Sequence, residues 1–477
     1  ESPITHFGIG KHEQADVLRI IWTNGIPHSL IQPQGNQLIT EQQTLKGSCP
    51  YLYTWDGEQF TFVTDLLWAS PIGLQTATAE IMPDRPWEYL KISGEQLKPV
   101  DGQYRLQITE ELWEAAYFDQ VELIAVDHPA DVDIFTNEKV GPPFMAEHKI
   151  HTVKNKKLPV SAKDTFGQDI LELLSKQDDQ YVRAFRKKIR QGYTEPHFIE
   201  LDLGDLSDAK QITLFLSGWI YPTDTSINIQ LSQNSQLPGP RPPFITTPNA
   251  EGNWIETRGF MGFPGGKTKT IAVDISDVFA AEDYRIRINT SSEIHWDAAF
   301  FTVDEGAAKT VEHLAPLLSA DLHSRGVSTR IIHSQYGPER YDYHQVITTP
   351  AWPAMQGNFT RFGDVTEVIR NADDQLVVIG TGDEITLTFA EPTTPLPPGW
   401  KRDFVLHNIG WDKDADLNTI YGQTVEPLPF QKMSAYPPLP LEQPTDAAYQ
   451  QYLEQYQTRQ QSHSRFKNAV RYGGFVE

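Results

Sequence analysis

The stretch PYLYTWDGEQFTFV (residues 50–63) decides the fold class of this chain. β-Branched and aromatic residues flank Asp56-Gly57, and an Asp-Gly pair supplies the positive-φ backbone that a tight hairpin turn needs. The stretch therefore predicts two antiparallel strands, 50–53 and 59–63, joined by that turn.

Segments of the same kind recur along most of the chain, and they predict strands at 89–92, 104–108, 120–126, 198–203, 211–217, 226–231, 254–257, 270–274, 284–289, 295–303, 375–379 and 384–389. Short strands at this spacing, separated by Gly and Pro, are typical of sandwiches and jelly rolls. We therefore predict a mainly β protein, a multi-domain β-sandwich or jelly roll.

Two segments depart from the strand pattern. ILELLSKQDDQYVRAFRKKIRQ (170–191) is rich in helix-forming residues, which predicts a small helical insertion. The tail is Pro-rich from Pro437 and runs into DAAYQQYLEQYQTRQQ (446–461), where Tyr449, Tyr452 and Tyr456 fall on one face of a predicted helix.

The composition excludes several classes of partner. The formal net charge is −23, from 63 Asp and Glu against 40 Lys and Arg, which argues against nucleic acid as a partner. Cys49 is the one cysteine of the sequence, so no intrachain disulfide framework or thiol metal cluster is possible. No run approaches the roughly 20 apolar residues of a membrane helix, so we expect no integral membrane segment.

The segment HFGIGKHEQADVLRIIWTNGIPHSLIQPQGNQLITEQ (6–42) resembles the ASPIC/UnbV domain, whose pattern runs HFGLG, then V-x-V-x-W-P-x-G, then N-Q-x-L-x-I-x-E. The matching positions include Trp22, Gly25, Asn36, Gln37 and Glu41. Thr23 stands where the family usually has proline. Segments 49–68 and 399–430 are similar to parts of bacterial proteins that carry this domain.

In proteins similar to cartilage acidic protein, this domain follows a propeller of calcium-binding FG-GAP/VCBS repeats. The resemblance implies an exported protein, located outside the cell, on its surface or in a bacterial periplasm. It also implies that the propeller is missing or separately encoded, because the chain begins inside the domain.

These observations together predict a division of the chain into six parts. The expected parts are an ASPIC/UnbV-like β domain at 1–45, a β-sheet domain at 46–140, a helical insertion at 141–195, a jelly-roll-like sandwich at 196–310, a β-rich domain at 311–436 and a tail with a helix at 437–477.

A calcium site is the first candidate for a functional site. Asp412, Asp414, Asp416 and Asn418 place oxygen atoms at alternate positions, which in a looped chain can converge on one hard cation. The segment lacks the glycine and the bidentate glutamate of an EF-hand loop, since Leu417 and Gln423 stand there. The alternative is a hydrogen-bonded turn or a solvated loop.

Two further sites are weighed against structural roles. Glycan binding would use the aromatic faces of Trp219, Tyr221, Trp254 and Trp296, although core packing is the stronger explanation for them. A hydrolase would need paired carboxylates, and its candidates are Glu110, Glu111, Glu114 and Asp119.

The first hypothesis for function is a non-enzymatic, exported or cell-surface binding or scaffold protein. It would contact a protein partner, further copies of itself or a glycan, with calcium assisting. The alternatives are a carbohydrate-active hydrolase that uses paired carboxylates, and an accessory subunit of a larger extracytoplasmic complex.

Overall fold

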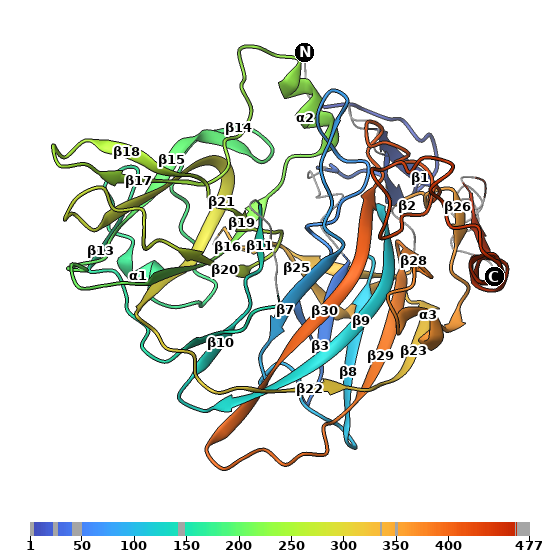
Figure 1. Ribbon diagram of the computed structural model, residues 1–477. Helices are drawn as coiled ribbons and strands as arrows, with labels where there is room; N and C mark the ends of the chain where they lie inside the picture. The colour runs from blue at the N-terminus through green and yellow to red at the C-terminus, as the bar shows by residue number, and fades with distance from the viewer. Residues whose placement is uncertain are drawn as a thin grey trace.

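The computed structural model describes residues 4–21, 27–40, 50–141, 148–333, 336–348, 352–462 and 464. Strands make up 46% of the structure and helices 6%, which confirms the mainly β class. Most of the strands belong to two β-sandwiches that lie side by side (Figure 1).

The first sandwich consists of a six-stranded and a five-stranded sheet. The six-stranded sheet has the order β27 (Gly363–Asp364), β23 (Leu317–Ser324), β29 (Asp383–Ala390), β8 (Gln103–Thr109), β3 (Tyr51–Trp55) and β4 (Phe60–Asp65). The other has the order β22 (Val311–Ala315), β9 (Glu114–Pro129), β30 (Trp400–Asp414) and β7 (Trp87–Ile92), with β28 (Val377–Gly380) also pairing with β9. The hairpin predicted at 50–63 is confirmed as β3 and β4, with Gly57 at φ +110°.

The core of this sandwich lies between its two sheets. Leu106 and Ile108 of β8 meet Phe118 and Leu123 of β9 and Leu406 of β30 in one buried cluster. The central strand β9 is buried along most of both faces, so its sequence carries little polar alternation.

The second sandwich is inserted between β9 and β22. Its strands are β13 (Ser161–Asp164), β14 (Lys188–Arg190), β15 (Tyr193–Asp202), β16 (Ile212–Tyr221), β17 (Phe244–Pro248), β18 (Trp254–Phe260), β20 (Lys269–Asp274) and β21 (Arg285–Val303). The first half of β21 pairs with β15 and β17 and its second half pairs with β16, so one long strand serves both sheets.

The insertion leaves and re-enters the first sandwich at one place. β9 ends at Pro129, and β22, which begins at Val311, pairs with it from Asp127 to Leu123. The ranges 46–140 and 311–436, predicted as separate domains, therefore contribute strands to the same two sheets.

Short elements complete the structure. The two-stranded pairs are β1 (Val17–Ile21) with β2 (Pro27–Ile31), β5 (Gln75–Ala77) with β6 (Glu80–Ile81), β10 (Asp133–Phe135) with β12 (His151–Val153), β11 (Lys139–Val140) with β19 (Phe263–Pro264), β24 (Val327–Ile331) with β25 (Arg340–Ile347), and β26 (Gly357–Phe359) with β31 (Arg459–Gln461). The helices are α1 (Leu171–Leu174), α2 (Thr225–Ser232), α3 (Thr366–Ile369) and α4 (Ala447–Tyr456). None of the helices described is long and apolar enough to span a membrane.

Helices are placed differently from the prediction in two segments. The stretch 170–191 is helical only at α1, and a strand, β14, lies near its end. Residues 226–231 were expected to form a strand but belong to α2, because Asp224 caps the helix by accepting a hydrogen bond from Ile227 N at 2.8 Å.

The tail helix is confirmed as α4, and it packs on the first sandwich. Tyr452 and Tyr456 are buried in the core of that sandwich, and the Tyr452 hydroxyl donates to Leu376 O at 2.8 Å. Near the start of the chain, β1 pairs with β2 in antiparallel register, whereas Trp22, Thr23, Gly25, Glu41 and Cys49 lie outside the described residues.

Buried polar groups join the two sandwiches. Asp65, fully buried at the end of β4, forms an ion pair with Lys269 of β20 and accepts the Lys267 N–H at 3.0 Å. Glu138 accepts hydrogen bonds from Lys91 N of β7 at 3.0 Å and from Thr270 N of β20 at 2.8 Å. These contacts fix β4 and β7 of the first sandwich against β20 of the second.

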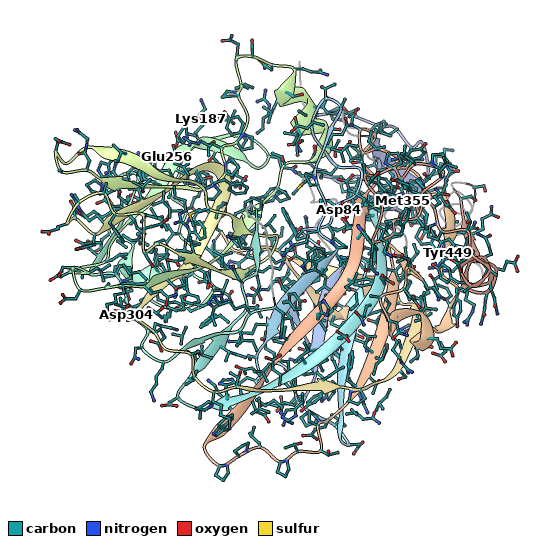
Figure 2. The ribbon with its side chains drawn as sticks, in the orientation of Figure 1. Asp84, Lys187, Glu256, Asp304, Met355 and Tyr449 are labelled. Carbon is teal, nitrogen blue, oxygen red and sulfur yellow. The ribbon has the colours of Figure 1, made fainter. Side chains whose placement is uncertain are left out.

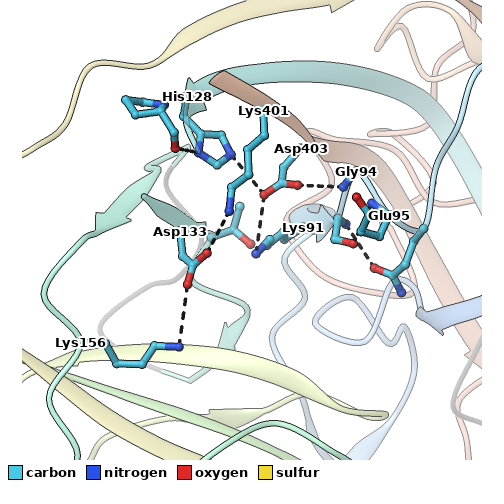
Figure 3. A network of polar contacts seen from close by, with 12 residues as sticks. Lys91, Gly94, Glu95, His128, Asp133, Lys156, Lys401 and Asp403 are labelled. Carbon is cyan, nitrogen blue, oxygen red and sulfur yellow. Dashed lines mark hydrogen bonds and ion pairs between the residues drawn. The ribbon is translucent and has the colours of Figure 1, made fainter. Parts of the chain in front are cut away.

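A second polar network lies where the chain enters the insertion (Figure 3). Asp403 of β30 pairs with His128 at 3.2 Å and accepts Gly94 N at 2.8 Å. Asp133 of β10 lies 3.1 Å from Lys401 of β30 and 3.9 Å from Lys156, which follows β12. Figure 2 shows the two bodies that these contacts join, with Lys187, Glu256 and Asp304 on the second sandwich and Asp84, Met355 and Tyr449 on the first.

The substitution Asp65→Ala is expected to lower the free energy of unfolding by about 3 to 5 kcal/mol, because it removes the ion-pair partner of the buried Lys269 ammonium. Denaturant unfolding followed by tryptophan fluorescence measures the change. Asp131→Ala is the matched control, since it breaks the exposed pair with Lys154 and is expected to leave the midpoint nearly unchanged. Equal losses in both variants would show that Asp65 does not hold the junction.

Candidate functional site

A cavity of about 790 Å³ lies at the junction of the two sandwiches. The segment between β4 and β7 forms one wall, and the end of β30 forms part of the same side. The second sandwich contributes α2, the segment around 238–242 and the region of β19. We call this space the interdomain cavity.

The helix α2 closes part of the cavity by crossing to the first sandwich. Asn228 Nδ2 donates to Gln75 O at 2.9 Å, and Thr225 Oγ1 lies 2.9 Å from Thr419 Oγ1. Figure 1 shows α2 at the top of the molecule, between the two bodies. The segment 226–231 thus shapes a wall of the cavity as a helix, where a strand was predicted.

Most of the lining is apolar. Trp68 and Phe263 come from different sandwiches and meet edge to face, with ring centroids 6.2 Å apart. Ile72 and Met82 from the first sandwich and Leu231 of α2 extend this surface. Such walls favour a ligand with an apolar body, because burial of apolar surface drives its transfer from water.

One region of the wall is acidic. Asp224, Asp412, Asp414 and Asp416 all line the cavity, and among the described residues that line it none is Lys, Arg or His. The cavity therefore combines apolar walls with a group of aspartate side chains on one side.

The strand register places these carboxylates. Asp412 pairs with Ala116 and Asp414 pairs with Glu114 in the ladder of β30 and β9, so Asp412, Asp414 and Glu114 share one face of the sheet. Trp411 and Lys413 point to the opposite face, where Lys413 Nζ donates to Val425 O and to the Tyr436 hydroxyl, each at 2.8 Å. The neighbouring lysine is thereby engaged away from the cavity.

Behind the wall lies a cluster of three carboxyl groups. Glu110, Glu114 and Asp412 have ligand oxygens within 4.8 Å of one another, and Glu114 shares hydrogen bonds with both of the others. Burial raises the pKa of Glu110 and of Asp412, and the neighbouring carboxylates raise both further. Glu110 and Asp412 therefore hold protons at pH values where ordinary carboxyl groups are ionised.

Asp414 and Asp416 build the turn that follows β30. Asp414 Oδ1 accepts Asp416 N at 3.0 Å and the Thr419 hydroxyl. Asp416 Oδ1 accepts Asn418 N at 2.8 Å and the Ser226 hydroxyl at 2.6 Å. Burial, followed by the charge of Asp416, raises the pKa of Asp414 to about 7.

The predicted calcium ligands are divided between these two arrangements. Asp412 belongs to the cluster with Glu110 and Glu114, whereas Asp414 and Asp416 accept hydrogen bonds within the turn. Asn418 directs its side-chain N–H to Ser226 Oγ at 2.8 Å. The turn weighed as the alternative is present, and calcium at these four residues stays a prediction.

The four aromatic residues considered for glycan binding have other partners. Trp296 is buried in the core of the second sandwich, and Trp219 stacks on His295 with centroids 5.0 Å apart. Tyr221 lies 6.0 Å from Trp219 between ring centroids. Trp254 of β18 is covered by the guanidinium of Arg287, 3.8 Å from its centroid. Among them, none lines the interdomain cavity.

The carboxylates considered for hydrolysis separate into different places. Glu110 and Glu114 join Asp412, while Glu111 accepts Ser328 N at 2.6 Å. Asp119 accepts Asp373 N at 3.0 Å and Asp374 N at 2.9 Å, and it also accepts Gln431 Nε2. Of the four residues, Glu110 and Glu111 precede β9 while Glu114 and Asp119 belong to it, and the structure brings together Glu110 and Glu114 but not the others.

Comparison with known proteins adds no assignment. No protein-family model matches the chain, and no curated protein matches it. A chain from a solved structure titled "Structure of infectious bursal disease virus Gx strain" matches with a TM-score of 0.10 and 6% identity, over 77% of this chain and 78% of that one. A likeness this weak carries no argument about fold or function.

The thermal stability of the natural protein is expected to fall as the pH rises from about 4 to about 7. The part of this fall that comes from Asp119 is expected to be absent in Asp119→Asn. Burial raises the pKa of Asp119 to about 7, with the charge of Asp374 adding to it, whereas an unfolded aspartate titrates near pH ~3.9. The folded form thus holds a proton that the unfolded chain has lost, and this stabilisation is present at low pH and gone above pH ~7.

Scanning calorimetry at about pH 4.5 and about pH 7.5 measures the effect, since the advantage of the natural protein over Asp119→Asn should shrink as the pH rises. Asn keeps an oxygen for the backbone donors at 373 and 374. A Tm difference that does not change with pH would contradict the assignment of the proton to Asp119.

Proposed function

We propose that this protein is an exported or cell-surface binding protein that takes a ligand into the interdomain cavity. The carrying observation is the cavity itself, about 790 Å³ in volume, with apolar walls and a few carboxylates on one side. Ligand sites typically have roughly 300 to 1,000 Å³ and this combination of lining groups. The ASPIC/UnbV resemblance supports export, and contacts with a protein, a glycan or a second copy of the chain belong to the same proposal.

A carbohydrate-active hydrolase is the second candidate, and one observation favours it. Asp412 and Asp414 stand two positions apart on the cavity face of β30, which separates their Cα atoms by about 7 Å. Paired carboxyl groups of glycosidases lie about 5 to 10 Å apart. The binding hypothesis needs fewer assumptions, because Asp414 is engaged in the turn and Asp412 in the carboxyl cluster.

The substitution Ala77→Trp is expected to weaken binding of the neutral apolar dye N-phenyl-1-naphthylamine by about tenfold or more, because the indole would occupy the space that the dye needs. Ala77 of β5 lines the cavity and is only half-buried, so the new side chain can point into the open space. Dye fluorescence titration measures the affinity.

Ala250→Trp is the matched control, since Ala250 is exposed at the turn between β17 and β18 and does not line the cavity. Equal dye affinity in both variants would place the binding elsewhere. Release of nitrophenol from aryl glycosides by the natural protein, abolished in Asp412→Asn, would instead favour the hydrolase.

A further inference from the structure

The lining of the interdomain cavity restricts the charge of the ligand that the proposed binding function implies. Among the described residues that line it, none is Lys, Arg or His, and the acidic ones are all aspartates. A carboxylate, sulfate or phosphate group would therefore enter the cavity without a counter-charge and beside groups of its own sign. Because a buried charge without a partner is costly, the lining disfavours an anionic ligand.

The aspartates of the wall are engaged with the protein itself. Asp224 caps α2 by accepting a backbone N–H of its first turn. Asp414 and Asp416 accept N–H and hydroxyl groups of the turn after β30 and of α2. Asp412 belongs to the buried carboxyl cluster. Each of the four groups thus has partners within the protein, and none of them requires a cationic ligand.

An uncharged polar group faces the same space. Ser292 of β21 lines the cavity and is only 6% exposed. Its backbone N–H donates to Thr290 Oγ1 at 3.0 Å, but its hydroxyl has no hydrogen-bond partner among the residues that the structure describes. The hydroxyl oxygen keeps some accessible surface, and in a residue this buried that surface faces the cavity. A hydroxyl both donates and accepts, so Ser292 can bind an uncharged polar group of a ligand.

A second hydroxyl-bearing residue lies at the same end of the cavity. Gly192 O accepts Glu293 N at 3.1 Å, next to Ser292 in the chain. On its other side, Gly192 approaches Thr223 so closely that a Cβ atom there would lie 2.4 Å from Thr223 N. Thr223 also lines the cavity. This end therefore suits a small polar group, and the apolar walls suit the rest of the ligand.

We propose that the interdomain cavity binds an uncharged, lipid-like molecule, whose hydroxyl group contacts Ser292 and whose apolar body packs between the walls of the two sandwiches. This inference rests on the proposed function, which it narrows from ligands with an apolar body to those that carry a hydroxyl and no charge. It assigns the apolar walls to affinity, and it assigns selectivity to Ser292 and to the lack of basic side chains among the described lining residues.

The test compares three ligands with the same linear ten-carbon chain that ends in a hydroxyl, a sulfate or an ammonium group. Displacement of N-phenyl-1-naphthylamine, at ligand concentrations below micelle formation, gives each affinity for the whole protein. The alcohol is expected to bind at least about tenfold more tightly than the sulfate, because the sulfate would lose its hydration without gaining a counter-charge. The ammonium is expected to bind no more tightly than the alcohol.

In Ser292→Ala, the affinity for the alcohol is expected to fall about threefold or more while the affinity for the dye is unchanged, because the dye does not need the hydroxyl. Thermal unfolding verifies that the variant is folded, and the ligand series in the natural protein tests the inference if it is not. Ser319→Ala is the matched control, because Ser319 of β23 is exposed and does not line the cavity, so both affinities should stay the same.

Sulfate or ammonium binding that is tighter than alcohol binding in the natural protein would overturn this inference and leave the proposed function standing. Equal affinity for the alcohol in folded Ser292→Ala and in Ser319→Ala would also overturn it, because the ligand hydroxyl would then lie elsewhere. Dye binding that Ala77→Trp does not weaken would overturn the proposed function itself.

Discussion

The buried ion pair between Asp65 and Lys269 fixes the two sandwiches against each other, and the interdomain cavity depends on it. A charge of each sign is removed from water at this junction, and neither is stable there without the other. The insertion adds a second constraint on the position of the second sandwich. Both ends of the insertion are held close together, because β22, which follows it, pairs with β9, which precedes it. With both in place, the segment after β4, the end of β30 and α2 meet around one space.

Local signals in the sequence predicted much of the strand content, and non-local pairing explains what they missed. Asp56-Gly57 and Asp101-Gly102 specify turns within a few residues, and both pairs occupy turns in the structure. The pairing of β22 with β9 joins residues separated by the whole insertion, so no neighbouring residues indicate it. At 226–231 the alternation of apolar and polar residues suggested a strand, although Asp224 before Thr225-Ser226 was a helix N-cap signal that could have been recognised.

The candidate site was partly predictable for the same reason. Alternate acidic positions from Asp412 to Asp416 were evident in the sequence, and a strand brings Asp412 and Asp414 to one face. Glu114 joins them only through the register of β30 with β9, and the apolar walls come from segments that lie far apart in the chain. The cavity is thus a property of the tertiary arrangement, while three of the four aspartates of its acidic wall come from one strand and its turn.

The proposed function places a ligand with an apolar body between the two sandwiches. The most direct measurement is a crystal structure of the whole protein with a linear alcohol that carries a bromine atom at the far end of its chain, with bromine located by anomalous scattering. We expect a bromine peak inside the interdomain cavity, between Leu231 and Phe263. Bromine peaks confined to the outer surface of the protein, with the cavity holding no ligand, would contradict it.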